Sequence, residues 1–281
     1  MLQSLAIAAS APVKVDNARR MFYNTQWIEL DLRNLDMSAC VSTYRMFLQC
    51  KNLDKILQNW DLRNLRDARE MFNGCGVKSL DTSNWNLSKL ENALGMFCAC
   101  KNLTQLDTSM WNLSKLQNAQ SMFAGSVVTE LDTTNWNLSK LKNGYSMFFM
   151  CQSLASITGS GNWDLSQVTN GSQMFQNCEA LTELDASDWQ LISLTNATSM
   201  FKGSGLQNLT INGQAFKKLA DLGAVQVDRT EYGEDDISEF YEAIMTFTGS
   251  VQGDTFVVTG LEKYRSRDGQ WEYPEVEEDV E

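Results

Sequence analysis

The hydrophobic and polar positions of this chain follow one pattern that repeats about every 25 residues, a period typical of solenoid proteins. Each copy has a Met-Phe pair, a small residue or cysteine four positions after the methionine, spaced leucines and, in most copies, a tryptophan. The pairs begin at Met21, Met46, Met71, Met96, Met122, Met147, Met174 and Met200, so successive numbers differ by 25, 25, 25, 26, 25, 27 and 26. The pattern predicts a solenoid whose coils each pack against their neighbours, with about eight to nine coils in residues 1–219.

The segment that ends at each tryptophan is predicted to be a short strand. In residues 103–111, Leu103, Leu106 and Thr108 point inward and Asp107 points outward, because side chains alternate across a strand. One strand per coil gives a parallel sheet along one side of the stack, with strands ~4.8 Å apart. The turn that leads into Met-Phe is predicted to be a short helix or a 3₁₀ segment.

The spacing between the two landmarks of the repeat predicts where insertions are tolerated. The step from each tryptophan position to the next methionine is always i to i+11, whereas the step from methionine to tryptophan varies between i+14 and i+16. The variable half of the coil is therefore expected to include a surface loop, where an extra residue can bulge outward.

Three columns of recurring residues are predicted to form ladders along the stack. Stacked phenylalanine and tryptophan rings would contribute ~2–3 kcal/mol each by buried area. Asparagine amides are expected to satisfy backbone groups of the turns from coil to coil. The ladder residues are Phe47, Phe72, Phe97, Phe123, Phe148, Phe175, Trp60, Trp85, Trp111, Trp136, Trp163, Trp189, Asn92, Asn118, Asn143, Asn170 and Asn196. A sugar-stacking platform is the functional alternative for the tryptophans.

Two further columns carry groups that can bind metals. Five cysteines occupy the position four residues after methionine, which elsewhere holds Ser or Thr, so buried free thiols that fill a tight corner are predicted. Asp81, Asp107 and Asp132 occupy successive coils and are expected to point outward. Salt bridges to the lysines of the same three coils would relieve their mutual repulsion. Calcium binding is the functional alternative, with these three residues as weak candidates.

The pattern fades after Phe201, and residues 220–281 form a distinct acidic segment. This segment has 17 acidic and 4 basic side chains, whereas residues 1–219 have 18 and 19. Leu206 and Leu209 mark a final strand. A helix is predicted over 234–247 from its apolar face, and strands are predicted over 224–227 and 255–259. Together they are expected to form a small α+β cap that covers the open edge of the last coil or docks elsewhere.

The N-terminal residues are expected to continue the repeat. Residues 1–10 (MLQSLAIAAS) are mildly apolar but have no basic residue before the apolar stretch, and Leu2 and Leu5 fall at the leucine positions of a coil. They are interpreted as part of a coil and not as a cleaved signal. The chain has no apolar stretch of the ~20 residues that a transmembrane helix needs, so membrane insertion is not expected.

Composition argues against several functional classes. The chain contains no histidine, the commonest general base and metal ligand. It has no basic stripe that would neutralise phosphates, so nucleic acid is not an expected partner. No cofactor and no enzymatic activity are expected. A carbohydrate-active solenoid enzyme that uses the Asp column is the remote alternative, although a uniform ladder does not place two carboxylates in different environments.

The string MFxxCxxLxxLDxSxWxLxxLxNA resembles the BspA-like leucine-rich repeats of bacterial surface proteins. Repeats of this kind also occur in mycoplasma lipoproteins and in some bacteriophage structural proteins, and the resemblance covers about residues 2–216. It implies a non-enzymatic leucine-rich-repeat solenoid that is displayed for adhesion or recognition. The expected partners are other proteins, either virion components or a host surface, with carbohydrate as a second class.

The free cysteines and the expected lack of a leader favour one setting within this resemblance. A phage structural protein is made in the host cytoplasm and then assembles into a particle, so a virion accessory protein of the tail, fibre or capsid surface is the leading hypothesis, located at the virion surface. A bacterial or protist leucine-rich-repeat surface or interaction protein, located at the cell surface or in the cytoplasm, is the alternative.

Overall fold

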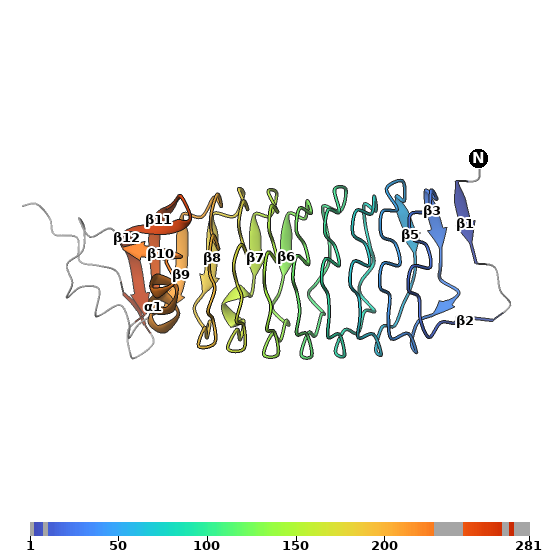
Figure 1. Ribbon diagram of the computed structural model, residues 1–281, viewed down its shortest axis with the longest axis horizontal. Helices are drawn as coiled ribbons and strands as arrows, with labels where there is room; N and C mark the ends of the chain where they lie inside the picture. Colours follow the sequence, from blue (N-terminus) through green and yellow to red (C-terminus); the bar gives the residue numbers. More distant parts are fainter. Residues whose placement is uncertain (1–2, 8–10, 228–243, 266–269, 273–281) are drawn as a thin grey trace, which may run out of the picture.

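The computed structural model describes residues 3–7, 11–227, 244–265 and 270–272. The chain winds into an elongated stack of coils, with β1 (Ser4–Ala6) at one end and the elements β9 to β12 at the other (Figure 1). Each Met-Phe pair falls in the same corner of a successive coil. The architecture is a β-solenoid, as the repeat period predicts, and the leucine-rich-repeat assignment itself stays a prediction.

The strands of the solenoid pair in parallel but do not form one continuous sheet. β1, β3 (Glu29–Asp31) and β5 (Lys55–Leu57) form one sheet, β6 (Glu130–Asp132) and β7 (Ser156–Thr158) a second, and β2 (Val13–Lys14) and β4 (Leu35–Asp36) a third. β8 (Glu183–Ala186) pairs with β9 (Asn208–Asn212). In the coils between β5 and β6 only Lys55↔Ser79 forms a bridge on this side. The prediction of one strand per coil is therefore wrong for the middle of the stack.

Hydroxyl groups replace part of the backbone ladder in these middle coils. The Leu32 N–H donates to the Leu57 carbonyl at 2.8 Å. At the equivalent position the Thr108 hydroxyl donates to the Asp132 carbonyl at 2.6 Å, and the Thr82 hydroxyl bonds the next coil in the same way. The Thr133 hydroxyl makes the same kind of bond to the Thr158 carbonyl at 2.7 Å beside the regular pairing of β6 with β7, so such a bond is compatible with strand register and does not by itself interrupt the sheet.

The Met-Phe corner is built from turns and not from the predicted helical segment. In each of the eight coils, the residues one before and three after the methionine have left-handed backbones with φ between 52° and 66°. A right-handed helix cannot continue through such residues. Alternate N–H groups instead point along the stack: Gly95 donates to Gln120 and Phe97 to Met122, both at 2.8 Å. The intervening N–H of Met96 closes a turn onto the Ala93 carbonyl at 3.0 Å.

The longest coil shows how extra residues are accommodated. A 3₁₀ segment, η1 (Ser160–Asn162), lies in the coil with the longest step from methionine to tryptophan, which runs from Met147 to Trp163. It follows Gly159, whose φ is 78°. Ser160 is nevertheless fully buried, and its hydroxyl donates to the Asp185 carbonyl at 2.8 Å. The insertion is in the variable half of the coil, but it packs inward and is not the surface loop that the spacing predicts.

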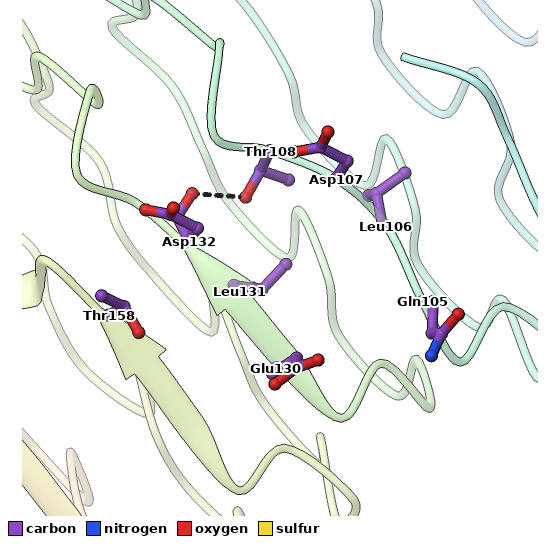
Figure 2. Close-up of a pocket in the computed structure, with 8 residues that line it drawn as sticks. All are labelled: Gln105, Leu106, Asp107, Thr108, Glu130, Leu131, Asp132 and Thr158. Carbon is purple, nitrogen blue, oxygen red and sulfur yellow. Dashed lines mark hydrogen bonds between the residues drawn. The ribbon is translucent and has the colours of Figure 1, made fainter. Parts of the chain in front are cut away.

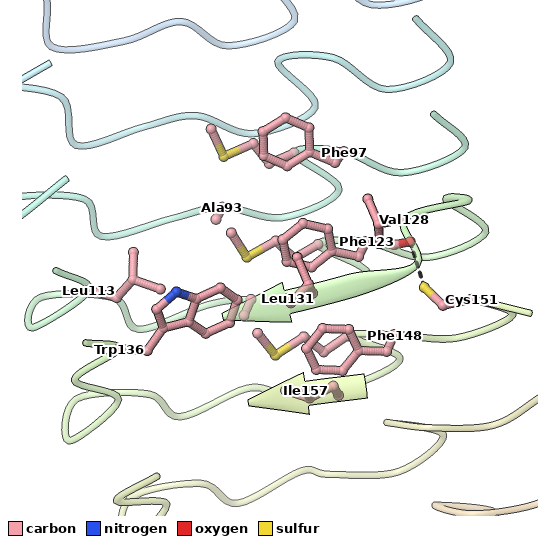
Figure 3. Close-up of a cluster of buried hydrophobic side chains, with 14 of the residues drawn as sticks. Ala93, Phe97, Leu113, Phe123, Val128, Leu131, Trp136, Phe148, Cys151 and Ile157 are labelled. Atoms are coloured by element: carbon pink, nitrogen blue, oxygen red, sulfur yellow. Dashed lines mark hydrogen bonds between the residues drawn. The ribbon is translucent and has the colours of Figure 1, made fainter. Parts of the chain in front are cut away.

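The core runs the length of the stack as columns of rings. Between Phe22 and Phe201, the ring centroids of phenylalanines in neighbouring coils are 5.2–6.0 Å apart. Between Trp85 and Trp189, the ring centroids of tryptophans in neighbouring coils are 5.9–6.2 Å apart. Trp60 packs on Phe47 at 6.2 Å. Figure 3 shows Phe97, Phe123 and Phe148 stacked in successive coils beside Trp136. These tryptophans, from Trp60 to Trp189, are at most 3% exposed, which excludes a sugar-stacking platform.

The C-terminal elements cover the last coil. β11 (Ile244–Gln252) pairs antiparallel with β9 and with β12 (Thr255–Arg265), which also pairs with β10 (Val225–Val227) and β13 (Trp271–Glu272). α1 (Gly213–Asp221) packs beside them, with Phe216 in contact with Phe247 at 4.9 Å. Among the described helices, none has the length and apolar character of a membrane span.

Two sequence expectations for this region need correction. The helix predicted over 234–247 is wrong at residues 244–247, which begin β11, and residues 234–243 are outside the described part. Pairing with strands on both sides overrides the helical spacing of the apolar residues. α1 was not predicted, although Asn212 is a favourable N-cap and its side chain accepts the Ala215 N–H at 2.9 Å. The strands predicted over 224–227 and 255–259 are confirmed.

Candidate functional site

A hollow on the strand side of the solenoid contains two of the three candidate aspartates. It has a volume of about 380 Å³ and lies between β6 and the preceding coil, where the sheet is interrupted (Figure 2). Its floor is the buried pair Leu106 and Leu131. Its lining residues are Gln105, Leu106, Asp107, Thr108, Glu130, Leu131, Asp132 and Thr158. Asp81, one coil earlier, is not among them, so the structure brings together only Asp107 and Asp132.

Each aspartate of the column caps its own turn. Asp107 accepts the Ser109 N–H at 3.0 Å and the Ser109 hydroxyl at 2.6 Å, and Asp81 makes the same two bonds with Ser83. Asp132 accepts the Thr134 N–H at 2.9 Å. The side-chain hydrogen bonds of Ser83 and Thr134 lower the pKa of Asp81 and Asp132, because they favour the ionised carboxylate.

The predicted lysine salt bridges do not form on these aspartates. Lys89 donates to the Asn64 side chain at 2.7 Å instead. The described ion pairs of residues 29–91 involve other carboxylates, among them Asp31 with Arg33, Glu70 with Arg45 and Asp54 with Lys78. Hydrogen bonds within the turn, and not lysine countercharges, therefore hold the aspartate column.

The lining of the hollow combines three carboxylates with the Gln105 amide and two threonine hydroxyls. Asp107, Glu130 and Asp132 line an apolar floor, which suits a ligand with hydroxyl, ammonium or guanidinium groups. The chain has no histidine to serve as a base beside them. Asp107 and Asp132 are held by the same kind of turn, closed onto Ser109 and Thr134.

Calcium is expected to leave the stability of the chain unchanged. Within the described residues no three His, Cys, Asp or Glu side chains are grouped to hold a metal ion, and calcium takes six to eight oxygen ligands. Adding 2 mM CaCl₂ to chelator-treated protein should therefore shift the thermal midpoint by less than about 1 °C, which differential scanning calorimetry would measure. A larger rise of the thermal midpoint that is lost in an Asp107→Asn/Asp132→Asn variant would contradict this expectation and show that these aspartates bind calcium.

The cysteine column is buried and hydrogen-bonded. The thiols of Cys50, Cys100, Cys151 and Cys178 donate to the carbonyl of the phenylalanine in the preceding coil at 2.8–3.2 Å. Figure 3 shows the bond from Cys151 to Phe123. Burial raises the pKa of Cys75 to about 12 and of Cys151 to about 11. The column therefore holds neutral thiols that bond one coil to the next.

Native protein at pH 8 is expected to react with Ellman's reagent at no more than one thiol. Cys98 is half-buried and the other six are buried, so only Cys98 is open to attack, and all seven should react in urea. Burial raises the pKa of Cys75 and Cys151 above the ordinary thiol value of 9.0, so folding favours their neutral thiols. The contribution of these two thiols to the free energy of unfolding is therefore full below pH 9 and falls as the pH rises toward 11–12. Rapid reaction of three or more native thiols would contradict the buried column.

The side chains of the asparagine column bond turn backbone within their own coil, and between coils they bond side chains at Ser42–Asp67 and Asn143–Gln120 instead of the predicted turn backbone groups. In all eight coils, Asn or its substitutes Ser42 and Asp67 accept the N–H two residues later at 3.0–3.3 Å. This is the bond of an Asx turn. Backbone bridges also join the coils at this position, from Ser42 to Asn196. A short side chain with an acceptor oxygen explains why Asn, Ser and Asp interchange there.

A cationic cluster in the first three coils was missed by the sequence analysis. The guanidinium carbon of Arg19 lies 5.1 Å from the centroid of the Tyr44 ring, and that of Arg69 lies 4.9 Å from it. Arg19, Tyr44 and Arg69 share one column of the repeat. Arg45 at 4.8 Å and Arg20 at 5.9 Å complete what we call the Arg-Tyr cluster. The signal was available in the sequence, since all five residues lie one or two positions before a Met-Phe pair.

One family model matches overlapping stretches of the chain, at residues 6–108, 42–160, 100–214 and 126–240. Overlap of this kind is expected where one repeat recurs throughout the matched region. Neither a curated protein nor a solved structure matches the chain significantly. The matched stretches run from residue 6 to residue 240 and so include more than half of the chain. The chain therefore belongs to the repeat family described as "Mycoplasma protein of unknown function, DUF285".

Proposed function

We propose that this chain is a non-enzymatic interaction module, whose solenoid presents a face of varied side chains to a protein partner. The observation that carries the proposal is a contrast between the columns of the repeat. The columns that recur are buried rings, thiols and leucines, or polar residues that close turns. The columns beside the Met-Phe corner change their chemistry from coil to coil while the backbone stays the same.

The varied face is best seen in the column two residues before each methionine. Its N–H closes the Asx turn, but its side chain has no shared structural role. In order along the stack this column reads Arg19, Tyr44, Arg69, Leu94, Gln120, Tyr145, Ser172 and Thr198, of which all but Ser172 are at least partly exposed. The column two residues after methionine adds Tyr23, Phe149 and Lys202. Aromatic residues and arginine are the side chains enriched at protein interfaces.

The other exposed faces repeat one solution to the same local problem. Pairs such as Asp107-Ser109 and Asn112-Ser114 recur, and in each the first residue accepts the N–H of the second at 3.0 Å. A surface occupied by turn-closing residues has little chemistry left for distinguishing one partner from another. We therefore assign recognition to the face that contains the Met-Phe corner.

Photo-crosslinking tests the choice of face. A benzoylphenylalanine introduced at Tyr145 should give a covalent partner adduct in the native host, whereas the same group at Lys115, on an Asx-turn face, should not. Mass spectrometry of the adduct then identifies the partner. Adducts of equal yield from both positions, or from Lys115 alone, would remove the proposal.

The virion setting is the more specific form of this proposal. Its support is the set of buried free thiols, since proteins of oxidising compartments more often pair their cysteines. The family description names a Mycoplasma protein, which supports the bacterial alternative. The BspA-like identity stays a prediction in both settings. Proteomics of purified particles and of the protease-accessible cell surface decides between them, since the chain should be abundant in one fraction only.

A further inference from the structure

The first coil leaves a row of backbone acceptors uncovered. In the second coil the carbonyls of Ser42, Tyr44, Met46 and Leu48 each accept an N–H from the first coil at 2.9 Å. The equivalent carbonyls of the first coil belong to Asn17, Arg19, Met21 and Tyr23, and no described residue donates a backbone N–H to them. These carbonyls belong to alternate residues, as the acceptors of a strand edge do, although the corner itself is built from turns, so an added segment that follows the turns could donate to them.

The methionine of this corner is exposed, whereas the equivalent methionine is buried in every later coil. Met21 is 41% exposed, whereas Met46 is fully buried, and Tyr23 is 49% exposed. The corner therefore offers backbone acceptors together with two apolar contacts.

The Arg-Tyr cluster gives this corner a positive charge that is only partly balanced. Arg45 makes two bonds to Glu70 at 2.8 and 3.1 Å, and Arg69 makes two bonds to Asp67 at 2.9 Å. Arg19 and Arg20 are exposed, and neither has a carboxylate partner within the described residues. Two guanidinium groups are thus available beside the open row, and such groups bind carboxylates through paired hydrogen bonds.

We propose that this corner docks residues 275–281 of a second copy of the chain. The segment reads EVEEDVE, with five acidic residues, two valines and no basic residue. Its carboxylates match Arg19 and Arg20, its valines match Met21 and Tyr23, and its N–H groups match the uncovered carbonyls. No other seven-residue run of the chain has five acidic residues; the acidic stretch 231–242 has at most four in any seven.

The geometry excludes docking of the segment on its own chain. Seven ring-to-ring steps of 5.2–6.0 Å separate Phe22 in the first coil from Phe201 in the last. β13, which ends at Glu272, pairs with β12, and β12 lies at the end of the stack opposite β1 (Figure 1). The nine residues after Glu272 span about 32 Å at most when extended, which is shorter than that path. The contact is therefore head-to-tail between copies, and such contacts propagate into chains unless a ring closes.

A fluorescent peptide of residues 270–281 tests the site on the full chain by anisotropy. Binding is expected at 50 mM NaCl and should weaken at least tenfold at 500 mM NaCl, because exposed charges are screened over about 10 Å at 0.1 M salt. A peptide of the same length with Gln and Asn in place of all six of its acidic residues, Glu272 included, should not bind. Absence of binding by the acidic peptide at 1 mM would overturn the proposal.

A matched pair of variants identifies the binding surface. Arg19→Gln/Arg20→Glu introduces residues that already occur in the same columns, as Gln120 and Glu70, so the fold should be kept. This variant should bind the peptide at least tenfold more weakly. Lys115→Gln/Lys140→Glu changes the charge equally on another face and should bind like the unmodified chain. Equal binding of the peptide by both variants would overturn the assignment of the binding surface to Arg19 and Arg20.

Sedimentation velocity of the full chain shows whether the docked segment comes from a second copy of the chain or from another protein. The apparent mass should rise with concentration at 50 mM NaCl, and a chain that ends at residue 272 should remain monomeric. A full chain that stays monomeric at 100 µM while still binding the peptide would overturn self-docking and leave an acidic segment of another protein as the occupant.

Discussion

Replacing Phe123 by alanine is expected to lower the free energy of unfolding by about 3–5 kcal/mol. The ring is fully buried between Phe97 and Phe148, each 5.6 Å away, and contacts Trp136 at 6.2 Å. Its removal leaves a cavity in a column that the neighbouring coils cannot close, because each coil is also fixed by backbone bonds on both sides. Urea unfolding followed by circular dichroism gives the value.

Met110→Ala is the matched control for this measurement. Met110 is 67% exposed in the coil next to Phe123, so its truncation should change stability by no more than about 0.5 kcal/mol. Because each coil touches only its neighbours, the Phe123 variant is also expected to unfold in two steps, with the coils on either side separating. A loss below about 1 kcal/mol for Phe123→Ala would contradict a tightly packed column.

Removal of the C-terminal cap is expected to cause end-to-end association. In a chain that ends at residue 221, β9 loses the five residue pairs that it makes with β11, and Phe216 loses its contact with Phe247. The unpaired edge of β9 then becomes a template for another chain. Light scattering should show an apparent mass that rises with protein concentration. The free energy of unfolding should fall by about 3 kcal/mol or more.

Salt separates this association from the head-to-tail contact proposed above. Pairing of strand edges and apolar surfaces persists at 500 mM NaCl, whereas a contact between arginines and carboxylates weakens. A chain that ends at residue 272 retains β9 to β13 and should remain monomeric and stable. If the chain that ends at residue 221 is also monomeric, the C-terminal strands do not protect the edge.

The solenoid could be predicted because the repeat is marked by large apolar residues, which can only be placed in the core. A ring or leucine that recurs once in every coil must be buried, and Phe123 or Trp136 illustrates this directly. The turns could not be predicted, because ordinary residues such as Arg45 and Glu70 adopt left-handed backbones there, with φ of 57° and 52°. Hydrogen bonds between coils impose that conformation, and the side chains do not signal it.

The site residues were harder to predict for a related reason. The aspartate column suggested a metal or salt bridges, but Asp107 and Asp132 are short acceptors that close turns. The residues of the Arg-Tyr cluster share two positions of the repeat, but their residue types do not recur in the later coils, and only the stacking brings Tyr44 between arginines of different coils. A search for departures from the repeat, in place of the repeat itself, would have found it.

Hydrogen exchange of the full chain, read residue by residue by mass spectrometry, tests the continuous stack most directly. The amides of Phe47, Phe72, Phe97, Phe123, Phe148 and Phe175 each donate to the methionine carbonyl of the next coil at 2.8–2.9 Å. All six should exchange with similar and strong protection, at rates set by global opening. Rapid exchange at two or more of them, with protection only in scattered coils, would contradict a single spine of stacked coils.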